Sequence, residues 1–136
     1  MTGTRLDAVG RDAAFELGKA TFERIMGSSA QGFCESVDGL APGYGRLILE
    51  TEFGTAYNRP GLDPKTRELV IIASCASLGV TGHGAVQTHI PAALNLGASR
   101  TEIVEVLLQI GFGAGFPTAL AALQVAKDAF AKLDGA

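Results

Sequence analysis

The sequence of 136 residues has few of the side chains on which disulfide-rich and metal-dependent proteins rely. It contains two cysteines, two histidines and no tryptophan. Cys34 and Cys75 stand far apart in apolar surroundings and belong to no Cys-x-x-Cys pair, so we expect two reduced thiols. The histidines belong to no His-Glu-x-x-His motif and to no cysteine–histidine cluster. The sequence therefore predicts neither a disulfide framework nor a metal site.

Charge is also scarce, at 18% of the residues, and the net charge is -3. A chain without a basic surface is a poor match for a nucleic-acid backbone. No run approaches the roughly 18 apolar residues that would span a bilayer, and the N-terminus carries charges where a secretory signal needs an apolar core. Phosphate-binding and nucleophile-elbow glycine motifs are missing too. We expect a cytoplasmic protein with neither a nucleic-acid partner nor a membrane partner.

The sequence does have apolar residues, 47% of the total, and they recur at helical rather than alternating spacing. Because the length suits one domain, we expect a single all-α domain over residues 1–136, a bundle of about six to seven helices. The glycine-rich segments 80–84 and 111–115 separate some of these helices. The predicted helices span residues 7–25, 29–37, 44–57, 64–78, 85–96, 101–110 and 117–133.

Two helix starts have explicit signals. Asp63 can accept amide hydrogens of a first turn that opens with Pro64, and Ser99 with Glu102 forms a capping box. Residues 69–78 are apolar almost all round, which predicts a helix buried on several sides. So much apolar surface exceeds what one small core absorbs, which favours a homo-oligomer.

His89, on the fifth predicted helix, and Glu68, on the helix before it, are the candidates for chemistry. Each has two interpretations: His89 is a structural histidine or a proton-transfer group, and Glu68 is its carboxylate partner or a surface residue favoured by the helix dipole. His83 lies in a glycine-flanked segment, and it is interpreted either as a solvated loop residue or as a substrate contact. Six helical residues would turn it about 120 degrees from His89, so the two cannot form a metal pair alone.

Two stretches carry a more specific pattern: RPGLDPKTRELVIIASCASLG, followed by THIPAALNLGASRTEIVEVLLQIGFGAGFPTALAALQVAKDAF. Together they resemble the carboxymuconolactone decarboxylase family, a branch of the alkylhydroperoxidase D-like proteins, over residues 59–130. The resemblance implies an alkylhydroperoxidase D-like helical bundle that assembles into trimers or hexamers. It implies active sites near subunit contacts, and no cofactor.

The namesake reaction of that family converts 4-carboxymuconolactone to 3-oxoadipate enol-lactone and carbon dioxide in aromatic catabolism. The resemblance implies a small-molecule lactone or carboxylate substrate, with His89 as general acid and Glu68 at the relay position of the peroxidase branch. Pro91 stands where decarboxylases of the family carry an arginine. Arg59 is the candidate to take the place of that arginine and bind a carboxylate of the substrate. The alternative is that Arg59 is a surface residue at a helix end. Pro91 should open or kink a helix beside His89.

Two alternatives to a lyase stay open. A thiol peroxidase of the related branch would need cysteines seven and four residues before the histidine, where this chain has Gly82 and Ala85. Cys75 has no resolving thiol nearby, which disfavours redox chemistry. The other alternative is a member of the family without catalytic activity, which binds small molecules or serves in an assembly.

Overall fold

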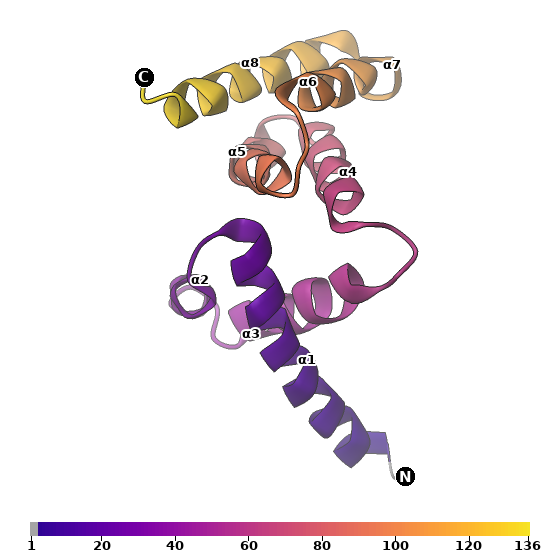
Figure 1. Cartoon of the computed structure of the whole chain (residues 1–136), viewed down its shortest axis with the longest axis vertical. Coiled ribbons are helices and arrows are strands. Elements are labelled where there is room, and N and C mark those ends of the chain that lie inside the picture. Colours follow the sequence, from indigo (N-terminus) through magenta and orange to yellow (C-terminus); the bar gives the residue numbers. More distant parts are fainter. Residues whose placement is uncertain (1–2) are drawn as a thin grey trace. The chain divides into compact units, whose positions relative to one another are not determined.

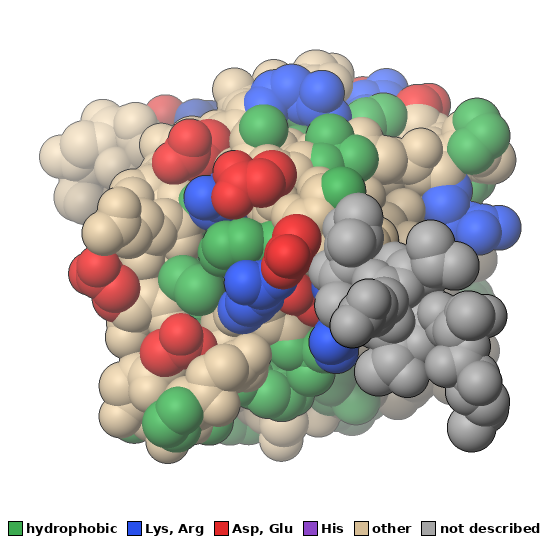
Figure 2. Space-filling model, turned by 90° about the horizontal axis from the view of Figure 1, so that it is seen from below, with side chains coloured by type: hydrophobic (Ala, Val, Ile, Leu, Met, Phe, Trp, Pro, Cys, Tyr) green, Lys and Arg blue, Asp and Glu red, His purple; other side chains and the backbone are tan. Residues whose placement is uncertain are grey.

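The computed structural model describes the backbone of residues 3–136 and side chains from residue 10 onward. The chain divides into two compact units, residues 1–61 and 62–136. Every regular element of the described residues is helical, which confirms the predicted all-α fold (Figure 1). On the face shown in Figure 2, acidic and basic side chains lie interspersed among apolar ones. None of the described helices is both long and apolar enough to cross a membrane.

The first unit consists of α1 (Gly3–Met26), α2 (Ala30–Asp38), α3 (Tyr44–Ile48), the π-helix η1 (Leu49–Thr55) and the 3-10 helix η2 (Ala56–Asn58). Two glycines allow α1 and η1 to pack in backbone contact. A Cβ on Gly18 would lie 2.0 Å from the carbonyl oxygen of Leu49, and one on Gly54 would lie 2.1 Å from that of Ala14. The predicted helix 44–57 is thus a continuous helical segment that changes from α to π and then to 3-10 geometry.

The second unit consists of α4 (Pro64–Ala76), α5 (Val80–Asn95), α6 (Arg100–Gln109), the single turn α7 (Gly111–Ala114) and α8 (Phe116–Leu133). Both predicted helix starts are confirmed. The Asp63 side chain accepts the amide hydrogen of Thr66 at 2.7 Å, and the capping box of Ser99 and Glu102 is complete. The expected glycine-rich break at residues 80–84 is wrong, because these residues form the first turn of α5.

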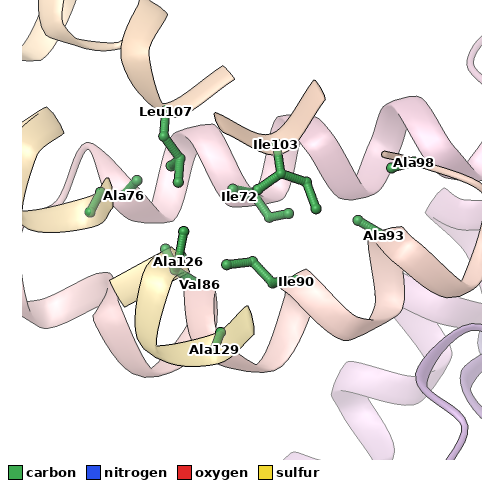
Figure 3. Packing of buried hydrophobic residues seen from close by; sticks show 11 residues of the cluster. Ile72, Ala76, Val86, Ile90, Ala93, Ala98, Ile103, Leu107, Ala126 and Ala129 are labelled. Atoms are coloured by element: carbon green, nitrogen blue, oxygen red, sulfur yellow. The ribbon is translucent and has the colours of Figure 1, made fainter. Parts of the chain in front are cut away.

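The core of the second unit combines branched aliphatic side chains with alanines, which let the helices approach closely (Figure 3). α4 packs against α5, α6 and α8. Its burial is nevertheless incomplete: Ile72 is fully buried, whereas Val70 is 52% exposed and Leu78, just beyond the helix, is 64% exposed. The prediction that residues 69–78 form a helix buried on several sides is confirmed by the contacts of α4 with three helices, while the side that carries Val70 is uncovered. The core cluster contains Ile72, Ala76, Val86, Ile90, Ala93, Ala98, Ile103, Leu107, Ala122, Ala126 and Ala129.

Candidate functional site

Glu68 lies on α4, one turn after the cap at Asp63, and its side chain is fully buried. Its interpretation as a surface carboxylate is therefore wrong. A carboxylate removed from water loses a large hydration free energy unless hydrogen bonds or an opposite charge replace the water. A buried acid at the edge of the apolar stretch of α4 therefore indicates a specific partner.

That partner is His89 on α5. Its Nδ1 lies 2.6 Å from Oε2 of Glu68, and 14% of its side chain is exposed. A carboxylate only accepts hydrogen bonds, so Nδ1 of the imidazole is the donor. The short distance is typical of a bond with an ionised partner. Since Nδ1 is engaged by Glu68, Nε2 is the nitrogen available to exchange a proton with another molecule.

The structure thus brings Glu68 and His89 together, as the sequence predicted. It places His83 differently from the predicted loop: His83 lies in the first turn of α5 and is half-buried. Its Nε2 is buried and has no hydrogen-bond partner in the part of the chain that the structure describes. Six residues of continuous helix turn the two histidine side chains about 120 degrees apart. A substrate contact by His83 stays a prediction.

Arg59 directly follows η2, at the end of the first unit, and is exposed. Its backbone N–H donates to the carbonyl of Ala56, which closes the 3-10 turn. Glu68 and His89 belong to the second unit. A contact between Arg59 and a substrate carboxylate stays a prediction.

Pro91 lies inside α5, two residues after His89, and the helix continues to Asn95. Of the two expected roles of Pro91, opening a helix is therefore excluded. Because proline has no N–H, it cannot donate to the carbonyl of Gln87, the usual acceptor four residues earlier. The turn that carries His89 therefore lacks one bond of the regular helical ladder.

The two cysteines are free and belong to different units, Cys34 to the first and Cys75 to the second. Burial, with the nearby Asp38 carboxylate, raises the pKa of the Cys34 thiol. A raised pKa lowers the thiolate fraction and so the reactivity. Among the described residues there is also no group of three or more His, Cys, Asp or Glu side chains that could hold a metal ion.

Sequence reasoning missed a polar network in the first unit. Arg46 binds the nearly buried Glu50 at 2.5 Å and also pairs with Asp12, and its guanidinium lies 4.5 Å from the centre of the Phe15 ring. These charged residues line a cavity of about 550 Å³ together with Tyr44. The signal was present in the sequence, since Arg46 and Glu50 are four residues apart on a predicted helix. Because two carboxylates balance Arg46, the network is suited to holding α1 against α3 and η1.

Comparison with known proteins identifies the family of the chain. The sequence model of the carboxymuconolactone decarboxylase family matches residues 42–128. A 4-carboxymuconolactone decarboxylase of Acinetobacter baylyi is 30% identical over 99 residues, 73% of this chain and 72% of the relative. An uncharacterized 15.0 kDa protein in the nqo9-nqo10 intergenic region of Paracoccus denitrificans is 32% identical over 99 residues, 73% of this chain and 74% of the relative. The chain therefore belongs to the carboxymuconolactone decarboxylase family.

Proposed function

We propose that the protein is a cofactor-independent carboxy-lyase that decarboxylates an unsaturated lactone acid, with His89 as the proton donor. The observation that carries the proposal is the 2.6 Å contact between Nδ1 of His89 and the fully buried carboxylate of Glu68. Membership of the family and similarity to a 4-carboxymuconolactone decarboxylase support the choice of reaction. A role in cytoplasmic catabolism of aromatic compounds belongs to the same proposal.

The proposed reaction is redox-neutral. The bond between the ring and the departing carboxylate breaks, and its electron pair forms a new ring double bond. The electrons of the existing double bond move to form a double bond between the adjacent ring carbon and the carbonyl carbon, the π electrons of the carbonyl move onto its oxygen, and carbon dioxide leaves. The dienolate then takes up one proton at the ring carbon next to the carbonyl. An enzyme for this reaction has to stabilise the dienolate oxygen and deliver that proton.

The pair of Glu68 and His89 suits the second task. The carboxylate holds Nδ1 and so fixes the orientation of the imidazole, while Nε2 gives its proton to the carbon. Arg59 and His83 are the proposed contacts for a carboxylate of the substrate.

The uncovered apolar side chains favour a homo-oligomer, and we include a trimer or hexamer in the proposal. Phe112 and Phe116 are 72% and 60% exposed, and their rings pack edge to face at 5.4 Å. Leu120 continues this exposed surface on α8. Exposed aromatic and aliphatic groups of this kind mark association surfaces. Sedimentation of the chain as a single 14.0 kDa species would contradict the oligomer.

The test is carbon dioxide release from a panel of unsaturated lactone acids that includes 4-carboxymuconolactone. We expect turnover by the wild-type protein, a loss of about 100-fold or more in His89→Asn, and no loss in Thr88→Ala. Thr88 is the matched control, because it is the preceding residue of α5 and is exposed.

Other outcomes would contradict the lyase. Saturable binding without turnover across the panel would indicate a member of the family that only binds small molecules. Peroxide reduction that disappears in Cys75→Ser would indicate redox chemistry. Equal turnover in His89→Asn and the wild type would remove His89 from the mechanism.

A further inference from the structure

We infer that Gly82 is a positioning residue, which holds α5 close enough to α4 for His89 to reach Glu68. A Cβ built on Gly82 would lie 1.8 Å from the carbonyl oxygen of Cys75, 2.6 Å from its carbonyl carbon and 3.1 Å from its Cα. All three are backbone atoms of α4, so no side chain can turn aside to make room. At this point the two helices are in backbone contact.

The contact and the catalytic pair belong to one antiparallel helix pair. Gly82 precedes His89 by seven residues on α5, and Cys75 follows Glu68 by seven residues on α4. Seven residues are close to two helical turns. His89 therefore lies on nearly the same face of α5 as Gly82, and Glu68 on nearly the same face of α4 as Cys75, each about 10 Å away along the helix axis. The backbone contact of Gly82 with Cys75 and the 2.6 Å contact of His89 with Glu68 therefore lie on the same side of both helices, two turns apart, where α4 and α5 face each other.

The distances show how little separation the pair tolerates. Ordinary contact of a Cβ begins at 3.4 Å, so a methyl group at residue 82 requires α5 to move about 1.6 Å away from the Cys75 carbonyl. A hydrogen bond between nitrogen and oxygen extends to about 3.2 Å. Less than half of that movement, transmitted along α5, would lengthen the 2.6 Å contact beyond this limit. Glu68 is fully buried, so its side chain cannot swing out to follow the imidazole.

The chain offers a matched control on the same helix. Gly84 lies two residues after Gly82, and a Cβ there would have no atom within 4 Å. Gly84→Ala therefore makes the same chemical change without touching α4. The role of Gly82 in catalysis rests on the proposed function, whereas its effect on the pair can be measured without any substrate.

The experiment compares the wild type, Gly82→Ala and Gly84→Ala by NMR of ¹⁵N-labelled imidazole, and then by turnover of the lactone acid. We expect the hydrogen-bonded Nδ1–H resonance of His89 in the wild type and Gly84→Ala, and its loss in a folded Gly82→Ala. We expect turnover about 100-fold lower in Gly82→Ala and unchanged in Gly84→Ala, because a displacement of about 1 Å can cost that factor.

The outcomes separate this inference from the proposed function. An unchanged Nδ1–H resonance in Gly82→Ala would overturn the inference, whatever the turnover. Loss of the resonance in Gly82→Ala, combined with no turnover by the wild type, would support positioning of the pair and contradict the lyase. If Gly82→Ala unfolds, it is measured in trimethylamine N-oxide, which favours compact states, beside the wild type in the same solution. Failure to fold even there would overturn the inference and make Gly82 a purely structural residue.

Discussion

The energetic coupling between Glu68 and His89 is the most informative stability prediction. In His89→Ala the fully buried carboxylate loses its imidazole partner, and removing one member of a buried pair costs about 3 kcal/mol or more. In Glu68→Gln the amide keeps the size of the side chain but loses the charge, which we expect to cost about 2 kcal/mol. In the double variant each substitution costs less than it does alone, because the partner that it would leave unpaired is also changed. The double variant should therefore cost about 3 kcal/mol, with a coupling free energy of about 2 kcal/mol.

The assay is urea unfolding followed by circular dichroism for the wild type, both single variants and the double variant. With a slope of about 1–3 kcal/mol per molar urea, the single variants should shift the midpoint by about 0.7 M or more. Additive effects, within about 0.5 kcal/mol, would show that the two side chains do not interact energetically and would refute the interpretation of the 2.6 Å contact.

Two further predictions concern stability away from the site. Gly54→Ala places a Cβ 2.1 Å from a backbone carbonyl oxygen of α1 and should lower the free energy of unfolding by about 2 kcal/mol. Gly10→Ala, with open space around the new Cβ, should not lower it, and thermal melts of the two variants and the wild type make the comparison. Hydrogen bonds from the Ser99 amide and from Lys65 lower the pKa of Glu102, so their stabilisation is full above the unfolded pKa, near 4.3, and is lost as pH falls further. Lys65→Met should make this acid loss shallower in melts recorded from pH 6 to pH 3, and an identical pH profile would contradict the assignment.

The sequence predicted the features that depend on local chemistry. Asp63 and the capping box at Ser99 mark helix starts because their side chains satisfy free amide hydrogens within three residues. The pairing of His89 with Glu68 was predictable as a candidate, since an isolated acid at the edge of an apolar helix needs a partner. The 2.6 Å distance needed the structure, because it depends on how α4 and α5 cross.

The features that the sequence did not predict arise from contacts between helices. Glycines such as those at residues 80–84 normally signal a helix break. Gly82 instead lies inside α5, where a glycine is needed because only a residue without Cβ fits against the backbone of Cys75. The change to π geometry over Leu49–Thr55 has no local signature either. Val70 is apolar but exposed, because the apolar pattern of α4 does not indicate which of its sides the neighbouring helices leave uncovered.

The most direct test of the central claim is a crystal structure of the protein with a saturated lactone acid, which lacks the double bond needed for decarboxylation. The account predicts that Nε2 of His89 lies about 3–3.5 Å from the ring carbon next to the carbonyl, with Nδ1 still bound to Glu68. Binding of the acid in the cavity beside Arg46, with Nε2 of His89 contacting no ligand atom, would contradict it.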